Sequence, residues 1–117
     1  MALAAMSGFI AVAAGAFAAH GMTDPTGKEL LRTGSSYEMY HALATILCST
    51  VMRAGGARAR FAPALFLGGT VLFSGSLYAL AFGAPHVVGI VTPIGGLAFL
   101  AGWAVLAWGA LGADQAA

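Results

Sequence analysis

Apolar residues along this chain come in four long blocks rather than in the short alternating runs of a soluble domain. These blocks cover residues 2–19, 37–52, 62–82 and 87–111, and none holds more than one charged residue. A helix rises 1.5 Å per residue, so about 20 apolar residues can cross roughly 30 Å of hydrocarbon. No Lys or Arg precedes the first block, which favours a membrane helix over a signal peptide. The pattern predicts four transmembrane helices.

The longest break between the blocks, residues 20–36, is the most polar part of the chain. Within it, Thr26 is followed three residues later by Glu29, which is typical of a capping box at the start of a helix. A short interfacial helix is therefore expected over residues 28–33. The second transmembrane helix is expected to begin only after this outer loop, at Tyr37.

A basic loop, residues 53–61, sets the expected orientation. It carries three arginines between two apolar blocks, and cytoplasmic loops of membrane proteins are enriched in Lys and Arg. The loop and both termini are therefore expected on the cytoplasmic side, with residues 20–36 outside. Because residues 83–86 form a tight turn, the four spans predict an all-α membrane protein, a single up-and-down four-helix bundle over residues 1–117.

Composition argues against a soluble domain. Of the 117 residues, 60% are apolar and 8% are charged, whereas a soluble domain devotes about a quarter of its residues to Asp, Glu, Lys and Arg. The net charge is +1 and the basic residues form no stripe or patch, so nucleic acid is not expected as a partner. Cys48 is the single cysteine, which excludes an intramolecular disulfide.

Glycines recur mostly seven residues apart, which places each set on one helix face. Small residues on one face let helices approach closely, and such packing replaces the hydrophobic driving force that lipid removes. The same faces can equally pack against another membrane protein or a second copy of the chain. The expected packing positions are Gly8, Gly15, Gly68, Gly75, Gly96, Gly102 and Gly109.

Polar side chains from all four predicted helices gather, on this topology, in the outer half of the membrane. Glu38 lies three residues before His41 on one helix face, so its carboxylate is expected to pair with that imidazole or with His20. The midplane and inner half are expected to lack charged groups, which argues against a continuous ion path. The candidate residues for this outer polar cluster are His20, Tyr37, Glu38, His41, Ser74, Ser76, Tyr78 and Thr92.

Two interpretations of this cluster stay open, a hydrogen-bonded network that ties the helices together and a site for a ligand, an ion or a proton. A haem or a metal held by His20 and His41 is a further alternative. The candidate ligands are dispersed and no Glu-x-x-His pair recurs on two helices. No cofactor, metal site or catalytic residue is therefore expected, and enzymatic activity is not expected.

Pro93 falls inside the last apolar block and leaves two structures open. Proline lacks a backbone donor and clashes with the preceding turn. Either the helix is kinked at Pro93, or it starts there after an irregular segment, residues 83–92, with Thr92 as its N-cap. In the second structure the helix N-terminus would point toward the outer polar cluster.

Four motifs, in order and over nearly the whole chain, resemble the bacterial membrane proteins grouped as domain of unknown function 423. They are GAFAAHG at residues 15–21, YEMYHAL at 37–43, FSGSLY at 73–78, and TPIGG at 92–96 with the later Gly102-Trp103. The resemblance implies a four-helix inner-membrane protein without an assigned activity, with relatives in the mitochondria of animals. Glu38 stands where the family motif usually has an amide, and Ala18 where it usually has a glycine.

These observations favour an accessory or assembly subunit of a larger complex in the bacterial inner membrane. The small size, the lack of a soluble domain and the glycine faces point to a membrane-protein partner or a homo-oligomer within the lipid bilayer. A small channel, carrier or lipid-binding protein that uses the outer polar cluster is the second hypothesis. An intramembrane enzyme is the third, and it requires closer spacing of reactive groups than the sequence offers.

Overall fold

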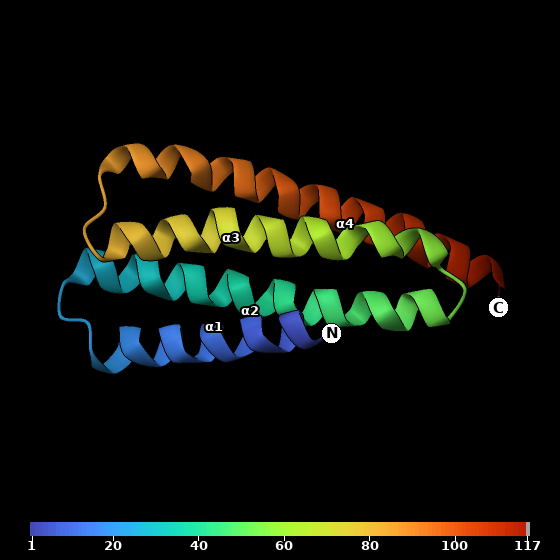
Figure 1. The fold of residues 1–117 in the computed structure, drawn as a ribbon, viewed down its shortest axis with the longest axis horizontal. Helices are drawn as coiled ribbons and strands as arrows, with labels where there is room; N and C mark the ends of the chain where they lie inside the picture. Colours follow the sequence, from blue (N-terminus) through green and yellow to red (C-terminus); the bar gives the residue numbers. More distant parts are fainter. Residues whose placement is uncertain (117) are drawn as a thin grey trace.

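The computed structural model describes residues 1–116 and consists of four long helices that run alternately in opposite directions (Figure 1). Two short 3-10 helices precede the third and fourth of them, and no strand occurs among the described residues. In chain order the elements are α1 (Ala2–His20), α2 (Pro25–Arg53), η1 (Ala57–Phe61), α3 (Ala62–Ala81), η2 (His86–Ile90) and α4 (Val91–Ala116).

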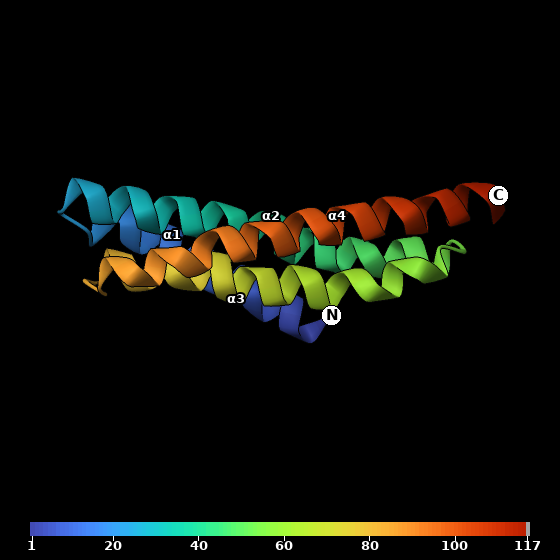
Figure 2. The same ribbon diagram turned by 90° about the horizontal axis from the view of Figure 1, so that it is seen from above.

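The helices pack in chain order, α1 against α2, α2 against α3 and α3 against α4, whereas α2 and α4 touch only lightly (Figures 1 and 2). The molecule is elongated, with a longest extent of 51 Å. Because α1 has 19 residues and α2 has 29, the last turns of α2 extend beyond the N-terminus of α1. We call the end formed by the C-terminus of α2, η1 and the C-terminus of α4 the arginine end, and the opposite end the His20 end.

α2 begins twelve residues earlier than the apolar pattern indicates. The Asp24 side chain accepts a hydrogen bond from the Gly27 backbone N–H at 2.8 Å, and Pro25 occupies the first turn, where its missing donor costs nothing. The expected outer loop to residue 36 and the expected separate interfacial helix over residues 28–33 are therefore wrong. Both belong to one continuous helix, which Asp24 caps in place of Thr26.

The reason is a buried stripe that runs through the polar first half of α2. Buried residues recur every three or four positions, which is the spacing of one helix face. This face packs on α3, and the charged side chains of the first turns lie on the other side of the helix, so the stripe holds the polar segment in the bundle. Its members are Gly27, Leu31, Gly34, Glu38, His41, Thr45 and Cys48.

Neither of the two structures expected around Pro93 occurs in the fourth helix. η2 leads directly into α4, which starts at Val91, so Pro93 lies in the first turn and neither kinks the helix nor begins it. A first-turn proline sacrifices no intrahelical hydrogen bond. α4 continues to Ala116, five residues past its expected end at residue 111.

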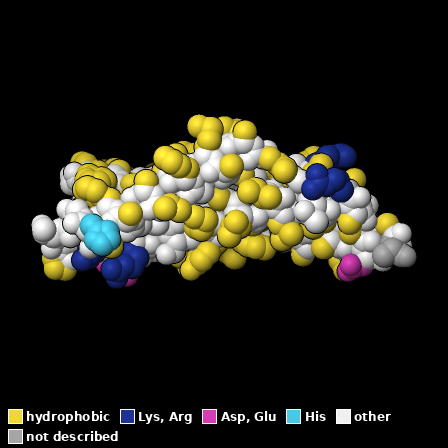
Figure 3. All heavy atoms as spheres, turned by 90° about the horizontal axis from the view of Figure 1, so that it is seen from below, with side chains coloured by type: hydrophobic (Ala, Val, Ile, Leu, Met, Phe, Trp, Pro, Cys, Tyr) yellow, Lys and Arg dark blue, Asp and Glu magenta, His cyan; other side chains and the backbone are white. Residues whose placement is uncertain are grey.

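Three helical segments are long and apolar enough to cross a membrane, namely Ala2–His20, Ala57–Ala81 and His86–Ala116. α2 is not among them. It carries Lys28, Glu29 and Arg32 in its first turns, and Glu38 and His41 near its middle. Side chains of Lys and Arg gather at the two ends of the molecule, and hydrophobic side chains cover the middle of the face in Figure 3. This distribution is the one that a membrane-spanning bundle requires.

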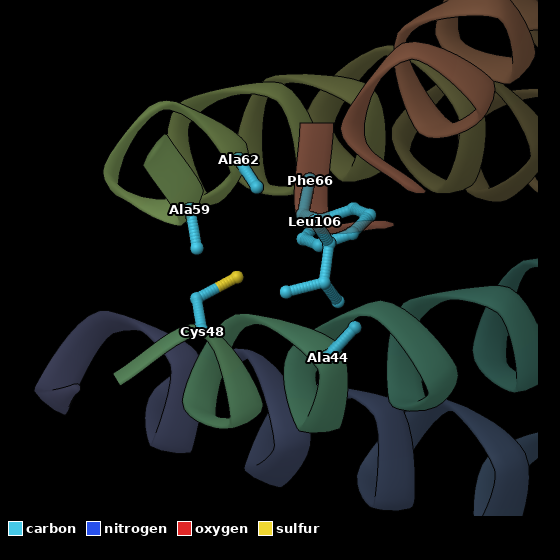
Figure 4. Close-up of a cluster of buried hydrophobic side chains, with 6 residues drawn as sticks. All are labelled: Ala44, Cys48, Ala59, Ala62, Phe66 and Leu106. Atoms are coloured by element: carbon cyan, nitrogen blue, oxygen red, sulfur yellow. The ribbon is translucent and has the colours of Figure 1, made fainter. Parts of the chain in front are cut away.

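The tightest packing lies toward the arginine end. A cluster of buried side chains joins α2, η1, α3 and α4 there, formed by Ala44, Cys48, Ala59, Ala62, Phe66 and Leu106 (Figure 4). A Cβ added to Gly109 would meet the backbone nitrogen and the Cβ of Ala59, each at 2.7 Å. α4 therefore lies almost backbone to backbone on η1, an approach that glycine alone permits.

The expected glycine positions divide into close and open contacts. A Cβ on Gly102 would lie 2.7 Å from the Phe66 ring, and one on Gly15 would lie 2.8 Å from the Ser35 hydroxyl. Gly8 and Gly96 make ordinary contacts, at 4.0 and 3.9 Å. Gly68 and Gly75 have nothing within 4 Å, so they pack no helix of this chain. Several glycines that were not expected also make close contacts, among them Gly34, Gly69 and Gly95, each against a residue of a neighbouring long helix.

Candidate functional site

Glu38 lies near the middle of the molecule, not at its outer edge as the sequence suggests. It is thirteen residues after Pro25, which is about 20 Å along a helix, and it faces Ser7 in the half of α1 remote from His20. The misplacement follows from the start of α2, because residues 25–36 are helical and push Glu38 deeper into the bundle. The structure therefore places a carboxylate near the middle of the bundle, deeper than the sequence indicates.

The Glu38 carboxylate is almost fully buried and ties three helices together. Its Oε2 accepts a hydrogen bond from the Ser7 hydroxyl at 2.8 Å, and its Oε1 accepts one from the Tyr78 hydroxyl at 2.7 Å. Only 4% of the residue is exposed. α1, α2 and α3 thus meet at one carboxylate, which has a hydroxyl donor on each oxygen.

His41 is directed toward α4 instead. The Trp103 indole N–H, which can only donate, points at the His41 Nε2 over 3.1 Å, so Nε2 must accept. The His41 Nδ1 then carries the proton and donates to the Tyr37 carbonyl oxygen at 2.6 Å. These partners select the neutral imidazole with its hydrogen on Nδ1. The ring stacks on Phe99 with a centroid separation of 3.5 Å and an interplanar angle of 6°.

The expected pairing of Glu38 with His41 or His20 does not occur, because the three side chains have different surroundings. Glu38 bonds to α1 and α3, His41 bonds to α4, and His20 is exposed at the end of α1. Both ring nitrogens of His41 are engaged, which leaves no free position for a haem or metal ligand. Within residues 1–116 no three His, Cys, Asp or Glu residues lie close enough to hold a metal ion.

The remaining polar candidates tie the helices together nearer the His20 end. The Ser74 hydroxyl donates to the Gly34 carbonyl oxygen at 2.7 Å and so links α3 to α2. The Ser76 and Thr92 hydroxyls are hydrogen-bonded at 2.5 Å and link α3 to α4. In the described part of the chain every buried side-chain nitrogen or oxygen has a hydrogen-bond partner. The predicted single cluster is therefore four separate sets of contacts, around Glu38, around His41, at Ser74 and at Ser76.

An aromatic groove lies between α2 and α4. Its volume is about 850 Å³, and Phe73 of α3 contributes to its lining. Three of its residues were expected from the sequence, Tyr37 and His41 as members of the outer polar cluster and Gly96 as a packing position. The four-residue spacing of Phe99 and Trp103 on one face of α4 was the available signal for the others. The α2–α4 groove is lined by Tyr37, Tyr40, His41, Phe73, Pro93, Gly96, Leu97, Phe99, Leu100 and Trp103.

A smaller cavity of about 310 Å³ lies on another side of α2, between α1 and α3. Its polar groups are the Glu38 carboxylate and the hydroxyls of Ser7 and Thr70. The α1–α3 cavity is lined by Leu3, Met6, Ser7, Ile10, Glu38, Leu67, Thr70 and Val71. Glu38 and His41 therefore belong to two different concave sites, although one helical turn separates them.

Comparison with known proteins gives relatives over nearly the full length. The family model for the protein of unknown function DUF423 matches residues 14–96. A UPF0382 membrane protein of Haemophilus influenzae is 44% identical over 110 residues, which cover 92% of this chain and 89% of the relative. The UPF0382 inner membrane protein YgdD of Escherichia coli K12 is 44% identical over 112 residues, 92% of this chain and 86% of that protein.

A relative of lower identity also aligns over most of the chain. A UPF0382 membrane protein of Staphylococcus epidermidis is 36% identical over 107 residues, covering 89% of this chain and 88% of the relative. No solved structure matches the chain. With its apolar helices and with relatives that align over almost their whole length, this chain belongs to the DUF423 family of UPF0382 membrane proteins.

Proposed function

We propose that this protein spans the inner membrane four times, with both termini in the cytoplasm, and serves as a non-catalytic accessory or assembly subunit of a larger membrane complex. In this proposal the α2–α4 groove receives a transmembrane helix of the partner protein. The observation that carries the proposal is the groove itself, a largely apolar groove of about 850 Å³ between α2 and α4.

A four-span topology requires α2 to cross the membrane although it is the most polar helix. Its polar residues in the middle of the bundle, Glu38, His41 and Thr45, are all buried and all hydrogen-bonded within the protein. A polar group that is satisfied inside a bundle does not face lipid. With 29 residues, α2 is about 44 Å long, which is enough to cross and to leave its charged first turns in the headgroup region.

The charge distribution supports an orientation with the arginine end in the cytoplasm. That end carries Arg53, Arg58 and Arg60, and the Arg58 guanidinium lies 4.9 Å from the centre of the Trp108 ring. Basic residues and interfacial tryptophans are typical of the cytoplasmic boundary. At the His20 end the exposed Glu29 and Arg32 form an ion pair at 3.6 Å, so their charges balance.

A test of orientation uses single cysteines in a Cys48→Ser background, labelled in intact cells with a reagent that does not cross the membrane. Thr26→Cys is expected to be labelled from outside, and Asp114→Cys only after the membrane is permeabilised. The opposite pattern would invert the proposed topology. A three-span protein would expose both positions on the same side of the membrane, so labelling of both from that side would exclude α2 as a span.

The shape of the α2–α4 groove matches a helix. Its α4 wall is formed by residues at positions 93, 96, 97, 100 and 103, which share one helix face and extend over about 15 Å. Gly96 lies in the middle of this wall, so another backbone can approach closely there. A helix about 10 Å wide and 15 Å long occupies roughly 1,200 Å³, and the groove, at about 850 Å³, accommodates most of it.

The chemistry of the groove also favours an apolar helix over a polar ligand. The buried His41 ring and the Trp103 indole, which is 43% exposed, are hydrogen-bonded to each other, and His41 also donates to the Tyr37 carbonyl oxygen. A partner helix therefore needs to supply no hydrogen bond and binds by shape. For the same reason we propose no catalytic role, since the imidazole of His41 has no nitrogen left for acid or base chemistry.

The experiment is native-gel migration with mass spectrometry of the untagged protein, extracted from its own membrane in a mild detergent. We expect one large assembly, which Gly96→Trp abolishes by filling the groove. Gly68→Trp is the matched control, because Gly68 lies on the open face of α3 with nothing within 4 Å, and it should leave the assembly intact.

Three outcomes would overturn the proposal. Wild-type protein that migrates as a monomer or small homo-oligomer excludes a partner subunit. A lipid or small molecule retained in the groove, without another protein, makes the protein a ligand-binding one instead. Loss of the assembly in Gly68→Trp but not in Gly96→Trp transfers the docking surface from the α2–α4 groove to the open face of α3.

A further inference from the structure

The α1–α3 cavity presents a carboxylate in an environment that offers it no positive charge. Glu38 is 4% exposed near the middle of the bundle, and its two oxygens each accept a hydroxyl hydrogen bond, from Ser7 and from Tyr78. Because each hydroxyl can donate to the carboxylate, the site is able to hold Glu38 in its ionised form once a cation is present.

The protein supplies no cation to this carboxylate. α1, α3 and α4 contain no Lys or Arg. On α2 the basic residue before Glu38 is Arg32, about 9 Å away along the helix, and its guanidinium is exposed and paired with Glu29. Within residues 1–116 that ion pair stands alone. An ionised carboxylate at the middle of a membrane bundle requires a positive partner.

The titratable groups around Glu38 do not provide that partner either. Tyr78 of α3 contacts the carboxylate and donates to it as a neutral hydroxyl. His41, one turn along α2, faces α4 and is held neutral by the Trp103 indole. α1 contributes only Ser7, which does not titrate. The counter-charge therefore has to come from outside the chain, either as a proton on the carboxyl or as a bound cation.

The walls of the cavity indicate which cation fits. Five of its eight lining residues are purely apolar, Leu3, Met6, Ile10, Leu67 and Val71, and several of these are exposed on the lipid-facing surface of α1 and α3. A hydrated metal ion finds few oxygen ligands there. An organic cation with an apolar body can place its charge on the carboxylate and its body against these walls.

We propose that the α1–α3 cavity binds a lipophilic monocation from the membrane, with Glu38 as its counter-charge and a proton as its competitor. The Ser7 and Tyr78 hydroxyls hold the carboxylate in position and the apolar walls select the ligand body. This site is separate from the α2–α4 groove. It requires the carboxylate of Glu38, which stands where the DUF423 motif usually has an amide.

The experiment measures binding of tetraphenylphosphonium to the purified full-length protein in detergent by isothermal titration calorimetry. We expect saturable binding that Glu38→Gln weakens by about tenfold or more, because the charge pair is lost while the size of the side chain is kept. Glu29→Gln, which removes an exposed acid near the His20 end, is the matched control and should bind like the wild type. Tetraphenylborate has the same shape with a negative charge and should not bind.

Competition with a proton gives a second readout that a purely structural role for Glu38 would not change. Where one cation replaces one proton, the association constant falls by about tenfold for each pH unit on the acid side. We expect this pH dependence in the wild type and its absence in Glu38→Gln.

Leu67→Trp fills the cavity without altering Glu38, and it should also remove binding, which keeps the test valid if Glu38→Gln unfolds. Equal binding by wild type and Glu38→Gln, binding of tetraphenylborate as strong as that of the cation, or wild-type binding that does not depend on pH would each overturn the proposal. So would unchanged binding in Leu67→Trp.

Discussion

The arginine end and the middle of this bundle differ in how closely α4 packs on its neighbours. At the arginine end, small side chains let α4 approach η1 until Gly109 touches Ala59, and the side chains of Cys48 and Phe66 are fully buried. In the middle, the large rings of Phe73 and Phe99 keep α4 apart from α2 and leave a groove of about 850 Å³ between them.

Polar groups follow the same division. The core cluster at the arginine end contains no side-chain oxygen or nitrogen, whereas the middle holds Glu38, His41 and their hydrogen-bond partners. Close glycine contacts with backbone occur in both regions, since Gly95 of α4 also lies against the backbone of Phe73, but of the two only the middle adds side-chain hydrogen bonds between helices. The arginine end is therefore expected to set stability, and the middle to set what the protein recognises.

The largest expected effect is at the arginine end. Phe66→Ala removes a ring that is fully buried and that packs against Gly102 of α4, so the free energy of unfolding in detergent should fall by about 3–5 kcal/mol. Phe9→Ala is the control, because 77% of Phe9 is exposed on α1. If both variants unfold at the same temperature as the wild type, the arginine end does not dominate stability.

A smaller loss is expected where α4 touches η1. In Gly109→Ala the added methyl group meets the backbone nitrogen of Ala59 at 2.7 Å, and a backbone atom cannot rotate aside, so unfolding should become about 1–3 kcal/mol easier. Gly68→Ala adds the same methyl group in open space and should be neutral or stabilising by up to about 1 kcal/mol, since alanine favours helix. Thermal unfolding of the two variants side by side measures the difference, and equal losses would contradict the close contact.

The first and third helices could be predicted from the sequence almost to the residue, whereas α4 starts four residues later and ends five residues later than expected. The third was expected over residues 62–82 and is α3, Ala62–Ala81. α2 could not, because charged residues hide the spacing of Gly27, Leu31 and Gly34 that continues its buried face. Composition decides where a chain turns polar, but the spacing of buried positions decides where a helix begins.

The residues of the candidate site could be predicted from the sequence better than their hydrogen-bond partners could. Glu38, Ser74 and Tyr78 were all identified, and each makes a hydrogen bond between helices. The partners Ser7 and Trp103 were not identified. Which residues they contact depends on the axial register of α1 against α2 and on the rotation of α4 about its own axis. One sequence does not fix either quantity, since several registers bury the same apolar faces.

The hydrogen bond between Trp103 and His41 allows the contribution of the middle region to stability to be measured. Trp103→Phe keeps an aromatic ring in the α2–α4 groove but removes the indole N–H, so the buried His41 Nε2 loses its donor. An unpaired buried acceptor costs about 1–2 kcal/mol, a smaller loss than that expected from Phe66→Ala.

Trp108→Phe is the matched control, because Trp108 is 49% exposed at the arginine end, and its loss should stay within about 0.5 kcal/mol. A double-mutant cycle with His41→Phe isolates the pair, and a coupling of about 1 kcal/mol between positions 41 and 103 is expected from thermal unfolding in detergent. Additive effects would mean that stacking on Phe99, and not the indole donor, holds the His41 ring in place. The middle of the bundle would then depend on ring packing, as the arginine end depends on the packing of small residues.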